Sequence, residues 1–239
     1  MISVCVTTYN GANYIEAQLR SILGQLSAHD EVIVSDDGST DDTLPIIRGI
    51  GDKRIRVLEH PHVGVTRNFY AALDEAKGEY IFLADQDDVW LEKKVSRCLE
   101  CLQKYDLVVT DAKVTDESLR VVEESLFELL NSREGLWKNW FACTFYGSTM
   151  AFRRSVLEAA RPYPSAKVIA HDWWIGMVAE MKGKVCFLKE PFVLYRRHAG
   201  TMTQVNRKSF LTRSPRPLHI KITARVCMLC YIFRYRLSH

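Results

Sequence analysis

The sequence lacks any long apolar run. None of its segments approaches the ~18 apolar residues that a membrane-spanning helix needs, and the N-terminus alternates Ile2, Val4 and Val6 in place of a basic start with an apolar stretch behind it. These absences predict a cytoplasmic protein without a secretory signal. A position on the cytoplasmic face of the inner membrane stays open.

Acidic residues are missing from the C-terminal part. Residues 203–239 hold eight Lys or Arg and no Asp or Glu, whereas the whole chain has 32 basic and 29 acidic residues. The first 202 residues are therefore mildly acidic, and whole-chain charge gives no support to a nucleic-acid partner. The basic tail is compatible with anionic lipid head groups or with a solvated edge.

The seven cysteines form no dense, even-numbered set of the kind that small secreted domains use for disulfides. Cys98 with Cys101 and Cys227 with Cys230 are CxxC pairs, but neither pair has further zinc ligands nearby. We expect buried, reduced thiols.

Short β-type runs alternate with longer helical patterns over the first hundred residues. Strands are expected at 2–8, 31–35, 55–59 and 80–84, and helices at 14–25, 42–50 and 66–76. This alternation predicts an α/β fold with a doubly wound, mostly parallel sheet covered by helices on both faces. A chain of 239 residues has room for one main domain.

We expect that domain over 1–202, with a nucleotide-sugar-binding half at 1–112, an acceptor-side half at 113–202, and the basic tail at 203–239. Its later part is predicted to contain a helix at 89–105, a strand at 107–112, an irregular stretch at 115–139, a helix at 154–160, a helix opened by HDWW (171–174), and paired strands at 185–188 and 192–195.

Three polar motifs follow predicted strands, so they should meet at the carboxyl edge of the sheet, where α/β folds bind ligands. They are TTYN (7–10), DDGST (36–40) and DQDD (85–88). The adjacent carboxylates of DQDD favour a hard cation such as Mg²⁺ or Mn²⁺. The alternative is that Asp87 or Asp88 caps the following helix.

DDGST also has two interpretations. Asp37-Gly38-Ser39 is suited to a turn, while a carboxylate after the strand can accept the imide N–H of uracil or thymine, for which Asp36 is preferred over Asp37. Arg67, near a predicted helix start, is a candidate for phosphate binding or a plain surface arginine.

The segment HDWW places Asp172 at a helix start. Asp172 is either an N-cap or a general base that takes the proton of an incoming hydroxyl, with Trp173 beside a sugar ring. His198, behind the last predicted strand, is either a surface histidine or a further metal ligand.

Taken in order, TTYNG, DDGST, GVTRNF, FLADQDDVW, STMAF, HDWW and YRRHAG resemble the family 2 glycosyltransferases, from Ile2 to about Thr201. The motifs DQDDVW and HDWW are similar to those of a bacterial rhamnosyltransferase branch of this family. The resemblance implies a GT-A fold, which is a Rossmann-like mixed sheet. It also implies that Thr7, Tyr9 and Asp36 contact the nucleoside, that Asp85 and Asp87 handle ribose and metal, that Asp172 is the base, and that His198 is a metal ligand.

The departures are modest, with Ser148 in STMAF and Thr7-Thr8 where many relatives have Pro-Thr. The function implied is an inverting, Mn²⁺- or Mg²⁺-dependent transfer of a sugar from a dTDP- or UDP-sugar to a lipid-linked oligosaccharide or a growing capsule or O-antigen polysaccharide. Rhamnose from dTDP-rhamnose is the first expectation.

Other classes fit less well. A catalytically silent nucleotide-sugar-binding or scaffold protein is the main alternative. A nucleotidyltransferase would carry a Gly-rich basic loop after the first strand, and a dehydrogenase would carry G-x-G-x-x-G there. For the tail, an interfacial helix over 226–233 and a helix packed on the domain stay equally open.

Overall fold

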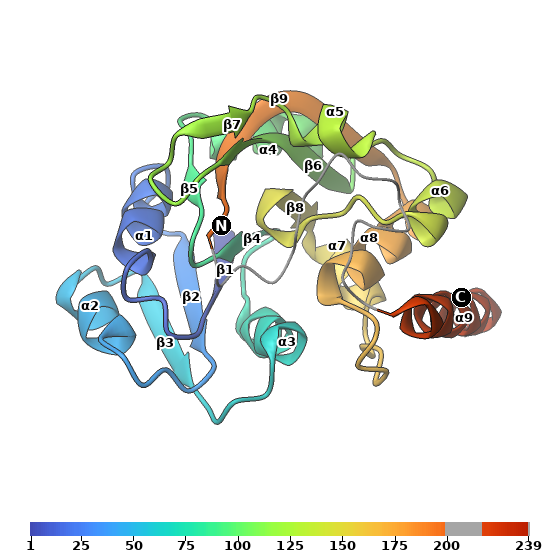
Figure 1. Cartoon of the computed structure of the whole chain (residues 1–239), viewed down its shortest axis with the longest axis horizontal. Coiled ribbons are helices and arrows are strands. Elements are labelled where there is room, and N and C mark those ends of the chain that lie inside the picture. Colours follow the sequence, from blue (N-terminus) through green and yellow to red (C-terminus); the bar gives the residue numbers. More distant parts are fainter. Residues whose placement is uncertain (199–216, 239) are drawn as a thin grey trace.

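The computed structural model describes residues 1–198 and 217–238 (Figure 1). In this part of the chain nine strands form one sheet, in the order β3-β2-β1-β4-β8-β6-β9-β5, with β7 paired to β6. The strands are β1 (Ile2–Thr8), β2 (Glu31–Asp36), β3 (Ile55–Glu59), β4 (Tyr80–Asp85), β5 (Val89–Trp90), β6 (Leu107–Thr115), β7 (Val121–Glu123), β8 (Met150–Arg153) and β9 (Val185–Arg196).

Helices cover both faces of this curled sheet (Figure 1). They are α1 (Ile15–Leu23), α2 (Thr43–Gly49), α3 (Val65–Glu75), α4 (Lys94–Leu102), α5 (Leu126–Leu130), α6 (Leu136–Phe141), α7 (Arg154–Ala159), α8 (His171–Lys182) and α9 (Leu218–Ser238), with a 3₁₀ turn, η1, at Gly147–Thr149. The predicted α/β class is confirmed, and the sheet is mixed.

The first four strands in the order form the parallel part, since β1 pairs in parallel with β2 and β4, and β2 with β3. Beyond β4 the direction changes, because β8 is antiparallel to both β4 and β6. β9 then runs parallel to β6 and pairs antiparallel with β5. Because β1, β2 and β4 are parallel, their carboxyl ends lie at one edge of the sheet.

Alternate side chains along the strands divide the core into two clusters, one for each face of the sheet. Val4 and Val6 of β1 pack with the helices α1, α2 and α4. Cys5 packs with α3, α7, α8 and α9 on the other face. Strands buried on both faces explain the almost continuous apolar runs in the sequence.

Three sequence-based expectations were wrong in detail. Residues 89–105 do not form one helix, because Val89 and Trp90 pair with β9 and the helix begins at Lys94. The segments 185–188 and 192–195 are not paired with each other. They belong to one strand, β9, in which a register shift against β6 accommodates the residues before Pro191.

The stretch 115–139 is also more regular than expected. It contains β7, α5 and α6. Ser125 caps α5 by accepting a hydrogen bond from the Glu128 N–H at 3.0 Å. The Ser-x-x-Glu spacing of a capping box was therefore present in the sequence.

The C-terminal helix α9 packs against the domain through Ala224, Met228 and Ile232, all buried. Much of the predicted tail, residues 203–216, lies outside the described residues. Within the described ranges, no helix combines the length and apolarity required to cross a bilayer.

Candidate functional site

The three polar motifs meet at the carboxyl edge of the sheet, as the strand pattern predicts. In the parallel register Thr8 of β1 lies opposite Asp36 of β2, and Thr7 lies opposite Asp85 of β4. Beside these strand ends is a cavity of about 360 Å³. Its walls come from the TTYN and DQDD turns, the start of α3, η1, the start of α8 and the end of β9.

Gln86, which sequence reasoning missed, fastens two of these turns together. Its Oε1 accepts hydrogen bonds from the Thr8 hydroxyl at 2.6 Å and the Tyr9 N–H at 2.8 Å, and its Nε2 donates to the Tyr9 carbonyl at 3.1 Å. Tyr9 is 44% exposed, and its ring lies 4.7 Å from that of His62 across the cavity mouth. The amide in Asp-Gln-Asp was the only signal for this role in the sequence.

The two aspartates of DDGST have different environments. Asp36 is buried, and both of its oxygens accept hydrogen bonds from its own turn, through the Gly38 and Ser39 N–H groups and the Ser39 hydroxyl. Asp37 is buried as well, and its two oxygens accept from the Val63 N–H at 2.7 Å and the Gly64 N–H at 3.0 Å, but it lines the cavity. The structure therefore brings Asp37, and not the preferred Asp36, to the cavity wall.

A buried charge cluster lies beneath the DQDD turn. Burial, and after it the neighbouring Asp87, raises the pKa of Asp85 and of Asp88 above the usual range of a carboxyl group. Lys94 is fully buried below them, and burial lowers its pKa to about 8. Its ammonium group donates to the Ser148 carbonyl at 2.6 Å and lies 4.2 Å from the Trp90 ring centroid. The protein alone therefore disfavours full ionisation of these carboxyl groups.

Asp87 and His198 are 111 residues apart in the sequence but lie in contact. The His198 Nε2 lies 2.9 Å from the Asp87 Oδ2, and both side chains are mostly buried in the cavity wall. Arg196 holds the same turn, donating from Nε to the Asp87 carbonyl at 2.7 Å and from its backbone N–H to Asp88 at 3.0 Å. The end of β9 thus positions the DQDD turn.

These residues fit a divalent cation as a partial set of ligands. Among residues 1–198 and 217–238 no three His, Cys, Asp or Glu side chains already converge as a metal site. A carboxylate and an imidazole with Asp85 nearby still match a hard cation that takes few protein ligands and completes its shell with substrate phosphates and water. A cation there would also favour the ionised carboxylates.

The cavity is also lined by Asp172, in the first turn of α8. Its Oδ1 accepts from the Trp173 N–H at 2.7 Å, and its negative charge contributes to the raised pKa of Asp85. Next to it, His171 is buried and stacks on Phe69 with ring centroids 3.9 Å apart. Among the described residues, neither ring nitrogen of His171 has a hydrogen-bond partner.

Besides Asp36, two predicted donor residues lie outside the cavity wall. Arg67 is exposed on α3, whereas its neighbours Thr66 and Asn68 line the cavity. Trp173 is buried and donates from its indole N–H to the Asn139 carbonyl at 3.0 Å. The bulky aromatics of HDWW therefore pack in the core behind Asp172.

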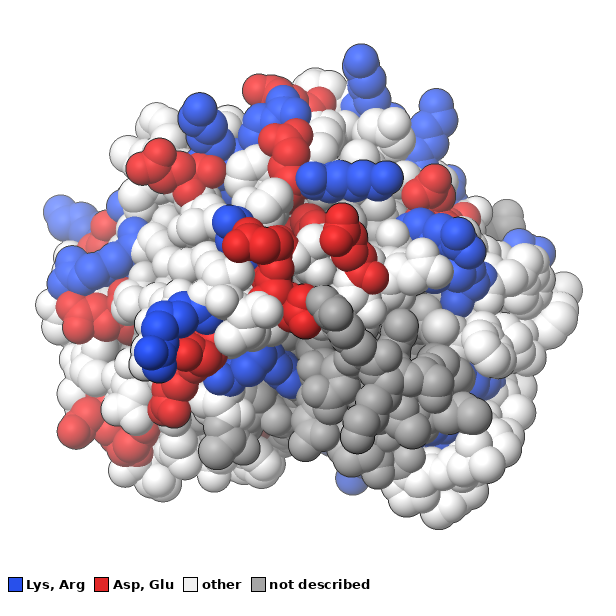
Figure 2. Space-filling view, turned by 45° about the horizontal axis from the view of Figure 1, so that its top comes forward, with Lys and Arg blue, Asp and Glu red and all other residues white. Residues whose placement is uncertain are grey.

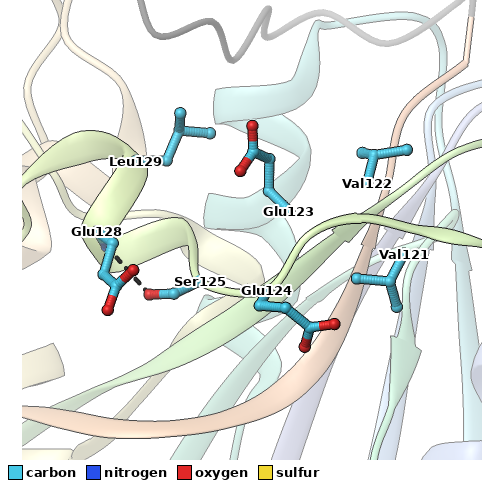
Figure 3. Close-up of a pocket in the computed structure, with 7 residues that line it drawn as sticks. All are labelled: Val121, Val122, Glu123, Glu124, Ser125, Glu128 and Leu129. Carbon is cyan, nitrogen blue, oxygen red and sulfur yellow. Dashed lines mark hydrogen bonds between the residues drawn. The ribbon is translucent and has the colours of Figure 1, made fainter.

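A second hollow of about 540 Å³ lies between β7 and the start of α5 (Figure 3). It is lined by Glu123, Glu124 and Glu128 with exposed Val121 and Val122. None of the strand-end motifs reaches it.

On the face in Figure 2, Lys and Arg side chains of the described residues alternate with Asp and Glu, without a continuous basic patch.

A mixed sheet with acidic turns at its carboxyl edge and a carboxylate on the facing helix is the architecture of GT-A glycosyltransferases. Residues 3–161 match the family model described as Glycosyl transferase family 2. The chain belongs to this family of glycosyltransferases.

Relatives from several bacteria support this assignment. The chain is 27% identical to the Escherichia coli UDP-Glc:alpha-D-GlcNAc-diphosphoundecaprenol beta-1,3-glucosyltransferase WfaP, covering 100% of this chain and 93% of that protein. It is 24% identical to the Shigella flexneri dTDP-rhamnosyl transferase RfbG (84% and 74%). It is 28% identical to an uncharacterized Nostoc glycosyltransferase, of which it spans 65%.

Solved structures show the same fold. Staphylococcus aureus TarS 1–349 in complex with UDP-GlcNAc superposes with a TM-score of 0.66 at 26% identity, over 84% of this chain and 59% of that one. The Pyrobaculum calidifontis mannosyltransferase PcManGT, in complex with GDP-Man and Mn²⁺, gives 0.62 at 24% identity, over 82% and 56%. The second likeness concerns the fold alone.

Proposed function

We propose that the chain transfers a sugar from a nucleoside diphosphate donor to a hydroxyl group of a polysaccharide or lipid-linked oligosaccharide, with inversion at the anomeric carbon. One observation carries this proposal. A single cavity is lined by the nucleotide-side turns, by the Asp87–His198 pair and by Asp172 from the first turn of α8.

In the proposed reaction, Asp172 accepts the proton of the acceptor hydroxyl as its oxygen forms a bond to C1 of the donor sugar. The bond from C1 to the diphosphate oxygen breaks on the opposite face, and the diphosphate leaves with the electron pair. Asp172 is suited to this role because it lies at the cavity wall at the start of α8, with its orientation held by the Trp173 N–H.

For the leaving group, we propose that Asp87, Asp85 and His198 hold Mn²⁺ or Mg²⁺. Such a cation supplies stabilisation of the negative charge that develops on the diphosphate. Tyr9, Thr7 and Asp37 are placed to contact the nucleoside. Asp36 then acts by shaping the turn that presents Asp37. Arg67 and Trp173 do not line the cavity, so we propose a smaller contribution to donor binding for them.

The donor follows from chemistry that the relatives share. WfaP is named for UDP-Glc and TarS was solved with UDP-GlcNAc, whereas RfbG is named for dTDP-rhamnose. In all three names the sugar is linked to UDP or dTDP, and both are pyrimidine nucleoside diphosphates. We therefore propose a UDP- or dTDP-sugar, with dTDP-rhamnose as the first candidate to test.

We also propose that the domain over 1–202 works at the cytoplasmic face of the inner membrane and that the tail over 203–239 contributes to this location. WfaP is named for a diphosphoundecaprenol-linked substrate. A lipid-linked acceptor presents its hydroxyl at a membrane surface, so capsule or O-antigen assembly is the proposed setting.

Calorimetry with UDP, dTDP and GDP, each with and without Mn²⁺, tests the donor site. We expect metal-dependent binding of UDP or dTDP that is lost in Asp87→Ala, and release of product from the matching sugar nucleotide by the wild type. Binding without any turnover on a panel of lipid-linked acceptors would favour the catalytically silent scaffold instead. If the protein bound none of the three nucleotides, the proposal would be refuted.

A further inference from the structure

Exposed apolar side chains concentrate on one side of the molecule. Of the thirteen large hydrophobic residues that are exposed in the described ranges, seven belong to α6 and α9. They are Trp137, Phe141, Leu218, Ile222, Val226, Phe233 and Leu237, each more than half exposed. Scattered single residues of this kind are ordinary on a protein surface, but a group on adjoining elements marks an interaction site.

The helix α9 has two separate apolar faces. One face carries Ala224, Met228 and Ile232, which are buried against the domain. At ~100° per residue, the five exposed apolar residues of α9 fall within an arc of about 100°, centred about 130° away from the buried face. A helix that only packs on its own domain needs one apolar face. The second face is more than packing on the described part of the domain uses.

The short helix α6 lies directly beside α9. The indole N–H of Trp140 donates to the Arg225 carbonyl at 3.0 Å, and the Arg225 guanidinium donates to the Phe141 carbonyl at 2.9 Å. These bonds fix the position of α6, and with it the exposed side chains of Trp137 and Phe141, next to α9 (Figure 1). We call α6 and the exposed face of α9 together the apolar surface.

The charge on α9 has one sign. Residues 217–238 hold Lys221, Arg225, Arg234 and Arg236 and no Asp or Glu. Arg234 and Arg236 are exposed, and at ~100° per residue Arg236 projects at one edge of the apolar arc. Apolar side chains bordered by cations, with Trp and Phe among them, match the interfacial region of an anionic bilayer, where aromatic rings and basic groups are both favoured.

We infer that the apolar surface binds an anionic phospholipid membrane, with α9 lying in the plane of the head groups. This inference rests on the proposed function insofar as a membrane-bound acceptor gives the contact its purpose. Because α9 keeps its packed face on α6 and α8, membrane binding leaves the fold unchanged and orients the domain by a rigid attachment.

Co-sedimentation of the full chain with vesicles tests the inference. We would use phosphatidylethanolamine and phosphatidylglycerol at about 3:1, with pure phosphatidylcholine for comparison, at low and high salt. The variant Ile222→Ser/Phe233→Ser should lower the partition coefficient at least about tenfold. The matched control Val121→Ser/Val122→Ser, which changes two exposed residues of β7, should stay within about twofold of the wild type.

Charge is tested by Arg234→Gln/Arg236→Gln, which should weaken binding to the anionic vesicles and reduce its salt dependence while leaving binding to phosphatidylcholine unchanged. Unchanged thermal midpoints and unchanged UDP binding with Mn²⁺ would show that each variant is folded.

Three outcomes would separate the possibilities. A wild type that binds UDP with Mn²⁺ but not vesicles overturns the membrane inference alone. Vesicle binding without any nucleotide binding supports the membrane inference and overturns the proposed function. A wild type that forms dimers, which Ile222→Ser/Phe233→Ser dissociates without an effect on vesicles, assigns the apolar surface to a second copy of the chain and refutes the membrane.

Discussion

Replacement of Gln86 by Ala should weaken nucleotide binding although no catalytic carboxylate is changed. Three hydrogen bonds would be lost, from the Thr8 hydroxyl, from the Tyr9 N–H and to the Tyr9 carbonyl, at 2.6, 2.8 and 3.1 Å. A net value of ~0.5–1.5 kcal/mol for each gives about 1.5–4.5 kcal/mol. Because the site is partly exposed, the lower end applies, about 1.5–2 kcal/mol.

That energy orients the Tyr9 backbone at the cavity, so most of its loss should appear in binding. At ~1.4 kcal/mol for each factor of ten, UDP affinity with Mn²⁺ should fall at least about tenfold in calorimetry. Gly11→Ala should act in the same direction, since a Cβ at Gly11 would lie 2.2 Å from the Gln86 Oε1 and displace the amide. Gln103→Ala, at the exposed C-cap of α4, is the control.

The reasoning would be refuted if Gln86→Ala and Gly11→Ala both bound UDP with wild-type affinity while their thermal midpoints fell. Gln86 would then stabilise the fold without positioning the nucleotide site.

Further predictions concern the base, pH and packing. Asp172→Asn should reduce transfer about 10²–10⁴-fold and leave UDP affinity unchanged, as measured by product release and calorimetry; a variant that turns over normally would exclude Asp172 as the base. Burial lowers the pKa of His171, although Asp172 opposes this shift. Below about pH 6.5 the imidazole of His171 therefore binds a proton more readily in the unfolded chain than in the folded protein. The thermal midpoint should fall between pH 7 and 5, and it should fall less steeply in His171→Phe. An equal pH dependence of the thermal midpoint in the wild type and in His171→Phe would contradict this prediction. Gly176→Ala should destabilise the fold by about 1–3 kcal/mol in denaturant unfolding despite alanine's helix preference, because its Cβ would lie 2.3 Å from the Phe145 ring. Gly49→Ala, with open space around it, should not be destabilising.

Much of the first half of the fold was predictable from local pattern. The strands at 2–8 and 55–59 were placed correctly, because β-branched runs bounded by turn residues have few other solutions. The same pattern placed the polar motifs at the carboxyl edge. In the second half, Val89 and Trp90 were assigned to a helix because strand pairing with the distant β9 leaves no local signal.

The site was predictable as a set of motifs but not as a set of contacts. Asp85, Asp87, His198 and Asp172 do line one cavity. Sequence reasoning preferred Asp36 to Asp37 because Asp36 is nearer the strand. Only the folded chain shows that the oxygens of both aspartates accept hydrogen bonds and that Asp37 lines the cavity.

The sequence by itself determined the family, the α/β alternation and the acidic turns, since these depend on residue types at fixed short spacings. The tertiary structure decided which side chains face the cavity and which are used in packing. It turned Trp173 into the core, joined Gln86 to Tyr9, and gave α9 a second, exposed apolar face. These outcomes depend on contacts between segments far apart in the chain, and no local spacing encodes the direction in which a side chain points once such segments pack.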